Sequence, residues 1–225
     1  MSTAPDGIYE KGVIDPGIPV DNLTNPFWLT GPVNFGKIQS PWVDSSDIVI
    51  IGSDMTASSL CRAPYSRGAP RIVLLEARDL CSGATGRNGG HMKAMSPGAW
   101  SDRKKMYGLE EAIKIMEYEH SHVDVMTACI REGNIDCDLD LLEGLDAYYD
   151  KKVFDHACKA VEEMLKYAPV LGKRYTIYKS REDLRSRNVS DECIEAIDMR
   201  AGSMWPYTMV IALLEKMIKD NNLLI

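Results

Sequence analysis

The chain has 225 residues, of which 45% are hydrophobic and 26% charged, and 26 Lys and Arg against 33 Asp and Glu give a formal net charge of −7. This composition is typical of a globular protein with a buried core and excludes a wholly disordered or fibrous chain. The acidic balance, with no basic run to offset it, argues against nucleic acid as a partner.

Neither a membrane segment nor a metal motif is visible in the sequence. No stretch approaches the roughly 20 consecutive apolar residues of a spanning helix, and residues 1–10 lack the basic and apolar segments of a secretory signal. We therefore expect a cytoplasmic protein with no membrane partner. The closest pair of its six cysteines is Cys129 and Cys137, eight residues apart, which excludes CxxC spacing and predicts no metal site.

The first 45 residues predict an extended arm. Six of the 11 prolines and five of the 17 glycines fall in the first 41 residues, with Phe27, Trp28 and Trp42 among them. Proline disfavours regular structure there. We expect the arm to lie over a folded body and to be held by these aromatic side chains.

The body opens with the most informative pattern of the chain. A β-branched run, residues 48–51, ends at Gly52, and a second apolar run, residues 72–75, is closed by Glu76. The segment between them, residues 56–67, is long enough for a helix. Continuous apolar runs of this kind are typical of buried parallel strands, so we expect a βαβ unit.

The rest of the chain predicts helices alternating with short strands. Apolar residues recur at helical spacing from Gly108 to Arg131, and Ser180 followed by Asp183 is typical of a capped helix start. The predicted helices cover residues 108–131, 151–171, 180–187 and 206–221. Short strands are predicted at residues 135–138 and 145–149, and a further buried strand at residues 222–225.

The turn between the first strand and helix resembles a dinucleotide site, in which glycines let the backbone approach the pyrophosphate and a later acid holds the ribose. Here it contains Gly52, Ala57 as the third small residue, and Glu76 as the acid. Asp54 stands where the second glycine belongs, and a like charge about 4 Å from a phosphate costs on the order of 1 to 4 kcal/mol. Pro64, inside the helical segment, predicts an early helix end. The alternative is an ordinary βαβ turn with a solvated acid.

The segment after Glu76 carries a more specific likeness. Glu76-Ala77-Arg78, followed by Ser82-Gly83-Ala84-Thr85-Gly86-Arg87-Asn88-Gly89-Gly90-His91, resembles the FAD-dependent oxidoreductases of the D-amino-acid oxidase type, especially fungal members. The segment Gly202–Tyr207 is also similar to that family. The resemblance implies an FAD that accepts a hydride from an amine or amino-acid-like small molecule. The residues implied to hold the FAD are Gly52, Ser53, Ala57, Glu76, Ala77, Arg78, Ser82, Thr85, Arg87, Asn88, Gly89 and Gly90.

The resemblance also implies a fold class and a domain plan. The class is α/β: the N-terminal part of an FAD-binding Rossmann-like domain with part of a mixed α+β substrate domain. After the arm (1–45), residues 46–100 hold the FAD-binding βαβ unit and glycine-rich loop, and residues 101–225 the substrate-domain portion. Members of the family are longer, so we expect an incomplete, truncated version, with uncovered sheet edges open to self-association. Two alternatives remain: an inert remnant that interacts without flavin, and a non-redox enzyme using the remaining cavity.

No catalytic residue is identified from the sequence. His91 would lie near the flavin ring, or is a plain loop histidine. His120 and His122 are only two residues apart on a helix, so their side chains point about 200° apart and do not form a metal pair. The acids between Asp136 and Glu143 match no calcium loop and predict a solvated turn. Tyr148, Tyr149 and the Trp205–Tyr207 segment could line a substrate cavity, but packing is the commoner role of such aromatics.

Overall fold

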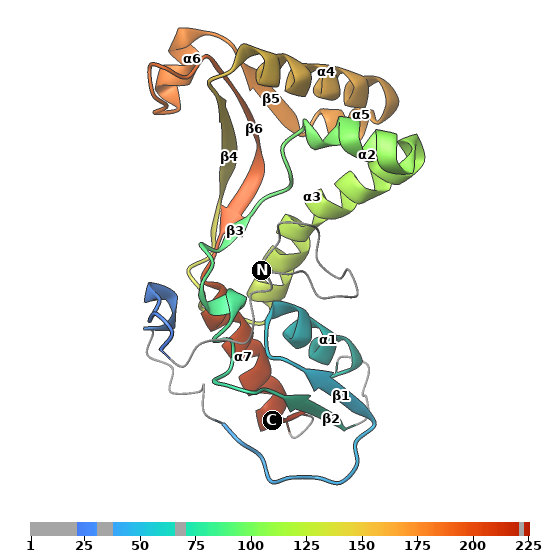
Figure 1. Cartoon of the computed structure of the whole chain (residues 1–225), viewed down its shortest axis with the longest axis vertical. Helices are drawn as coiled ribbons and strands as arrows, with labels where there is room; N and C mark the ends of the chain where they lie inside the picture. The colour runs from blue at the N-terminus through green and yellow to red at the C-terminus, as the bar shows by residue number, and fades with distance from the viewer. Residues whose placement is uncertain (1–21, 31–37, 66–70, 221–222) are drawn as a thin grey trace, which may run out of the picture.

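The computed structural model describes residues 22–30, 38–65, 71–220 and 223–225. Figure 1 shows an elongated molecule with one sheet at each end and a long helix, α3, running between them. The molecule is α/β, as the sequence predicts. No helix in the described ranges has both the length and the apolar character needed to cross a bilayer.

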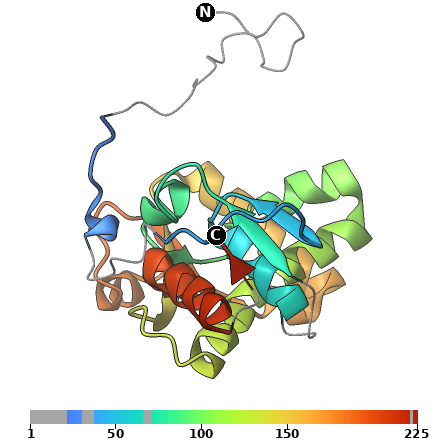
Figure 2. The same cartoon turned by 90° about the horizontal axis from the view of Figure 1, so that it is seen from below.

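The first unit is built on three parallel strands. They are β1 (Ile48–Ile51), β2 (Ile72–Leu75) and β7 (Leu223–Leu224), in the order β1-β2-β7. Two helices cover one face of this sheet, α1 (Met55–Tyr65) and α7 (Pro206–Lys219). Figure 2 shows α7 in red next to the strands.

The core of this unit lies between the sheet and the two helices. It includes Ile72 and Leu74 of β2, Val210 and Leu214 of α7, and Cys61 of α1. These apolar runs were the basis for predicting parallel strands, and the βαβ unit is confirmed. The strand predicted at the chain end is confirmed as β7, which pairs with β2.

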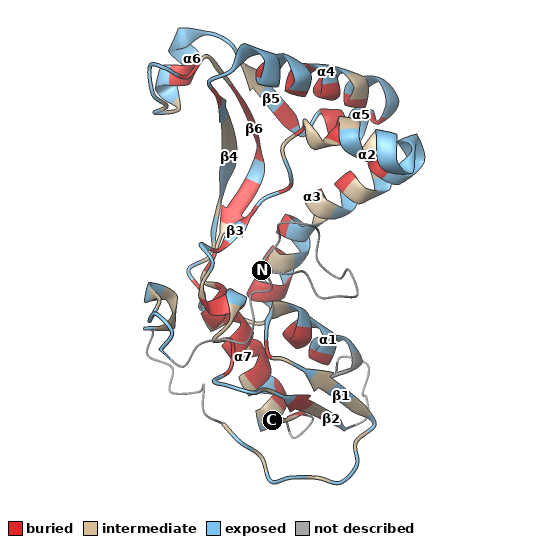
Figure 3. Cartoon of the chain, viewed as in Figure 1, coloured by how far each residue is buried: buried red, intermediate tan, exposed pale blue. Residues whose placement is uncertain are grey.

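The second unit is an antiparallel sheet with helices packed against it. Its central strand, β6, pairs with β4 along one edge and with β3 and β5 along the other. The strands are β3 (His91–Met92), β4 (Asp140–Tyr148), β5 (Tyr175–Tyr178) and β6 (Glu195–Ser203). The helices are α2 (Ala99–Tyr107), α3 (Leu109–Glu132), α4 (Lys151–Tyr167), α5 (Pro169–Gly172) and α6 (Arg181–Ser186). Figure 3 shows buried residues, in red, on the strand and helix faces turned towards one another.

Several sequence-based predictions are confirmed in this unit. The helix predicted over residues 108–131 is α3. Ser180 caps α6, because its hydroxyl accepts a hydrogen bond from the backbone N–H of Asp183 at 3.1 Å. In the first unit, α1 covers Met55–Tyr65 of the predicted helix, and residues 66 and 67 lie outside the described residues.

One other prediction is wrong, and two are correct only in part. Residues 135–138 form a loop, not a strand. Asp138, the last of them, and Asn134, just before them, have positive φ angles of 52° and 47°, which a strand does not contain. The strand predicted at 145–149 is the end of the longer β4. The helix predicted over 151–171 breaks at Ala168, whose φ of −143° is not helical. The following Pro169 disfavours helical geometry in the residue before it and starts α5.

In the described part of the chain, the helix α2 and the strands β3, β5 and β6 have no counterpart in the predictions. Strand β6 contains Asp198 and Arg200, and this polar content hides its central position in the sheet. Asp198 is buried because it accepts a hydrogen bond from the Tyr178 hydroxyl at 2.7 Å and lies 3.3 Å from the Arg187 guanidinium. A paired carboxylate is tolerated in a core position that an isolated one would destabilise.

The second face of the parallel sheet is largely open. Val49 and Ile51 of β1 are 56% and 85% exposed. Residues 38–46 cross this face, and a cavity of about 630 Å³ lies between them and the strands. Strand β1 is also an edge strand, so self-association through it stays a prediction.

The described part of the arm contacts the body through aromatic side chains. The indole N–H of Trp205 donates to the carbonyl of Trp28 at 2.8 Å, and the Phe27 ring stacks on Trp205 at 6.3 Å. Trp42, by contrast, is 80% exposed and does not hold the arm. Residues 1–21 and 31–37 of the predicted arm lie outside the described residues.

Candidate functional site

The site is built where β1 and β2 end. Gly52 follows β1 with a φ of +91°, and its N–H donates to the carbonyl of Leu75 at 2.8 Å. A residue with a side chain is strained at this φ, so glycine is required for the turn, although a Cβ there would meet no atom within 4 Å. The turn directs the chain from the end of β1 into α1.

Glu76 organises this turn from the end of β2. Its Oε2 accepts hydrogen bonds from the Ser53 N–H at 3.1 Å and the Ser53 hydroxyl at 2.5 Å, and its Oε1 accepts one from the Arg78 N–H at 3.1 Å. A carboxylate has about four acceptor positions, so about one remains for a ligand. Ala77 and Arg78 themselves are exposed.

The N-terminus of α1 carries its own acceptors. The Asp54 carboxylate accepts a hydrogen bond from the N–H of Ala57 at 3.0 Å, and the Thr85 hydroxyl oxygen accepts one from the N–H of Met55 at 3.2 Å. The first N–H groups of a helix have no partner within the helix and need an outside acceptor. Two of them are therefore satisfied by the protein, and Asp54 acts as a capping residue.

The glycine-rich loop runs beside this helix end and is held by its own side chains. The Asn88 side chain donates to the carbonyls of Ala84 and Thr85 and accepts from the N–H of Gly90 at 2.8 Å. Arg87 donates to Thr24 of the arm, to the hydroxyl at 3.0 Å and to the carbonyl at 2.8 Å. Its guanidinium is thus bound by the arm.

One polar group of the loop is left without a partner. The hydroxyl oxygen of Ser82 is buried and makes no hydrogen bond to any described residue. A buried hydroxyl without a partner costs free energy. Ser82 is one of the residues that the resemblance implies to hold the FAD. A ligand that hydrogen-bonds to its hydroxyl would remove this cost.

Two glycines of the loop are required by packing alone. A Cβ on Gly90 would lie 1.8 Å from the carbonyl oxygen of Met204, and one on Gly86 would lie 2.4 Å from the Leu29 side chain. Gly90 also has a positive φ of 72°. Gly89 differs, because a Cβ there would meet only the His91 ring at 3.7 Å. The fold therefore explains Gly86 and Gly90 without a ligand.

His91 lies at the far end of the loop, in β3, on a cavity of about 420 Å³. The cavity is lined by loop residues 88–90 and, from other elements, by His122, Met126 and Met204. Sequence reasoning missed these last three, because His122 and Met126 lie on α3 and Met204 follows β6. No local motif links them to the loop. His91 and His122 are exposed, whereas His120 is buried, as its opposite position on the helix predicts.

Cys81 joins the turn to the loop but has no reactive character. It is 2% exposed, its N–H donates to the Ser53 hydroxyl oxygen at 2.8 Å, and its thiol lies 2.9 Å from the Ser53 carbonyl. Burial, followed by the charge of Glu76, raises the pKa of the Cys81 thiol to about 12. A thiol with this pKa stays protonated at neutral pH and is a poor nucleophile.

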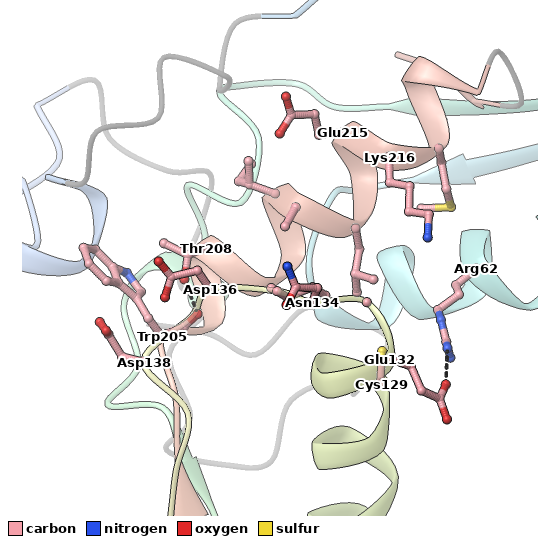
Figure 4. A pocket seen from close by; sticks show the side chains of 16 residues that line it. Arg62, Cys129, Glu132, Asn134, Asp136, Asp138, Trp205, Thr208, Glu215 and Lys216 are labelled. Carbon is pink, nitrogen blue, oxygen red and sulfur yellow. Dashed lines mark hydrogen bonds and ion pairs between the residues drawn. The ribbon is translucent and has the colours of Figure 1, made fainter.

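A separate cavity of about 690 Å³ lies between α7, Arg62 of α1 and the segment 129–138 at the end of α3 (Figure 4). Figure 4 shows Arg62 and Glu132 facing each other at one end, 3.6 Å apart, with Asp136, Asp138 and Trp205 at the other. None of the residues predicted to hold a cofactor lines it. In the described part of the chain, no three His, Cys, Asp or Glu side chains group in a way that could hold a metal ion.

Comparison by sequence gives no match, either to a family model or to a curated protein. Comparison by structure does. The L-amino acid deaminase from Proteus myxofaciens, solved in complex with anthranilate, matches 83% of this chain at a TM-score of 0.63 and 17% identity. The L-proline dehydrogenase from P. horikoshii matches 81% at a TM-score of 0.60 and 19% identity. The L-α-glycerophosphate oxidase from Mycoplasma pneumoniae, solved with FAD bound, matches 81% at a TM-score of 0.52 and 12% identity.

These matches cover 39%, 44% and 44% of the three neighbours, so this chain spans less than half of their length. At such identities the likeness shows the fold alone. The two-unit arrangement of this chain is therefore the fold of part of these enzymes.

Proposed function

We propose that this chain is part of an FAD-dependent oxidoreductase of the D-amino-acid oxidase type, which oxidises an amine or amino-acid-like small molecule by hydride transfer to the flavin. The observation that carries the proposal is a convergence: Gly52, Glu76 and the 82–90 loop meet at the carboxyl ends of β1 and β2. In open α/β sheets this edge is where nucleotides bind. The names of the structural neighbours, which include an amino acid deaminase and a proline dehydrogenase, support the substrate class.

The residues present fit the FAD only in part. The turn at Gly52 is open, Glu76 keeps about one acceptor position for a ribose hydroxyl, and the buried Ser82 hydroxyl lacks a partner. The pyrophosphate does not fit the turn as it stands, because Asp54 already occupies the end of α1 and carries the same sign of charge. Arg87, which would add positive charge, is bound to Thr24.

The cavity beside His91 is the proposed place of the small molecule. It lies between the loop of the first unit and α3 and β3 of the second unit, and its volume of about 420 Å³ suits an amino-acid-sized compound. Among the residues that line it, His91, Lys93 and His122 carry titratable side chains. None of the three is assigned a catalytic role.

The experiment that tests the proposal compares two flavins. Purified protein is titrated with FAD and with FMN, and binding is followed by flavin fluorescence after equilibrium dialysis. FAD carries the adenosine half that Glu76 would hold and FMN lacks it, so we expect saturable binding of FAD and none of FMN. The Asp54→Gly variant is titrated in parallel. If neither protein binds FAD, the proposal is rejected in favour of a non-redox or non-catalytic role.

A further inference from the structure

Asp54 makes the contact that a bound phosphate would make. In nucleotide-binding βαβ units the N–H groups at the start of the first helix face an anion, because the helix dipole and unpaired donors favour negative charge there. In this chain the Ala57 N–H already donates to Asp54 at 3.0 Å, and the carboxylate supplies the negative charge.

Three neighbouring donor groups are also hydrogen-bonded to acceptors of the same chain. The Met55 N–H donates to Thr85, the Ser53 N–H donates to Glu76, and the Arg87 guanidinium donates to Thr24. The N–H groups of Ser53, Met55 and Ala57 are thus paired within the chain, and so is the Arg87 guanidinium. A phosphate that bound to these N–H groups would have to replace the hydrogen bonds that they already make.

We propose that the Asp54 carboxylate is a built-in substitute for the phosphate anion: it caps α1, and it excludes pyrophosphate until its side chain turns away. Asp54 is exposed, so this rotation disturbs no buried packing. The choice of pyrophosphate as the excluded ligand rests on the proposed function. The capping of α1 by Asp54 is independent of that function, because it involves only Asp54 and the start of the helix.

The test uses inorganic pyrophosphate as the probe, measured by isothermal titration calorimetry. Asp54→Gly removes the carboxylate, and glycine is tolerated well at a capping position. Asp54→Asn removes the charge but keeps an oxygen that can accept from the Ala57 N–H. The matched control is Asp191→Gly, which removes an exposed carboxylate in a turn of the second unit.

We expect Asp54→Gly to bind pyrophosphate on the order of tenfold more tightly than the unaltered chain, and Asp54→Asn to lie between them. Asp191→Gly should match the unaltered chain. Equal binding by the unaltered chain and Asp54→Gly, or no binding by Asp54→Gly, would overturn the inference. If circular dichroism shows that Asp54→Gly does not fold, the test compares the pyrophosphate affinities of Asp54→Asn and the unaltered chain. Equal affinities of these two proteins would overturn the inference.

The flavin titration separates this inference from the proposed function. If Asp54→Gly gains pyrophosphate binding but neither protein binds FAD, the inference about Asp54 holds and the proposed function fails. If the unaltered chain binds FAD as tightly as Asp54→Gly does, the proposed function holds and the inference fails.

Discussion

The Ser53 hydroxyl donates to the Glu76 carboxylate at 2.5 Å and accepts the N–H of Cys81 at 2.8 Å. Ser53 is 1% exposed, so water cannot take its place. This one side chain joins the end of β1, the end of β2 and the start of the glycine-rich loop. A single buried hydroxyl therefore contacts all three parts of the candidate site.

Replacing Ser53 with alanine should destabilise the first unit. The Cys81 N–H would lose its acceptor in a buried position, and an unsatisfied buried donor costs about 1–3 kcal/mol. We expect the free energy of unfolding, measured by urea denaturation, to fall by about 2 kcal/mol. Ser59→Ala is the matched control, because the exposed Ser59 hydroxyl only donates to a carbonyl within its own helix. Similar losses for both variants would contradict the assigned role of Ser53.

The adjacent glycines of the loop should respond differently to alanine. In Gly90→Ala the new Cβ would lie 1.8 Å from the Met204 carbonyl oxygen, on a residue with a φ of +72°. Backbone must shift to relieve this clash, so we expect a loss of more than about 3 kcal/mol or failure to fold. Gly89→Ala should be tolerated, because its nearest neighbours are ring atoms of His91 at 3.7 Å. Thermal unfolding of both variants provides the comparison, and a stable Gly90→Ala protein would be the contrary result.

The arm should loosen when its contact with Trp205, the residue before α7, is weakened. Trp205→Phe keeps an aromatic ring but removes the indole N–H that donates to the Trp28 carbonyl. We expect chymotrypsin to cleave this variant faster near Phe27 and Trp28, and mass spectrometry of the fragments measures the rate. The control is Trp42→Phe, since Trp42 is 80% exposed. An unchanged cleavage rate in Trp205→Phe would show that the hydrogen bond from Trp205 to Trp28 does not hold this segment.

The sequence predicts an element correctly where the pattern lies within a short run of residues, and fails where the pattern depends on contacts with distant residues. The runs at 48–51 and 72–75 predict β1 and β2 correctly because both strands are continuous apolar segments in a parallel sheet. Strand β6 was missed because its buried Asp198 is paired with Tyr178 and Arg187, residues from elsewhere in the chain. A carboxylate in a strand reads as exposed until its partners are known.

The candidate site shows the same division. The positions of Gly52 and Glu76 follow from their spacing around the βαβ unit. The sequence also marks Asp54 as a departure from the glycine pattern, but not its capping bond to Ala57, which depends on side-chain rotation. The contact of Arg87 with Thr24 joins residues 63 positions apart, and no local pattern predicts it.

A buried histidine in the second unit gives the chain a pH dependence of stability. His120 is 4% exposed, and its Nε2 lies 2.8 Å from the Tyr175 hydroxyl. Burial, and then the positive charge of Arg174, lower the pKa of His120 from 6.5 to about 4, although Glu119 acts in the opposite direction. The folded chain therefore keeps this imidazole neutral at pH values where the unfolded chain protonates it.

Stability should consequently fall as the pH drops from about 6.5 to about 4, because the unfolded state then binds a proton that the folded state does not. The contribution of His120 is at most about 3 kcal/mol, since one pKa unit corresponds to about 1.36 kcal/mol. Urea denaturation at pH 7.5 and pH 4.5 measures the loss. In His120→Gln the side-chain amide can still bond Tyr175 but does not titrate, so this variant should lose less stability over the same interval. An equal loss in both proteins would assign the pH dependence to other groups, and His120 would then be a packing residue only.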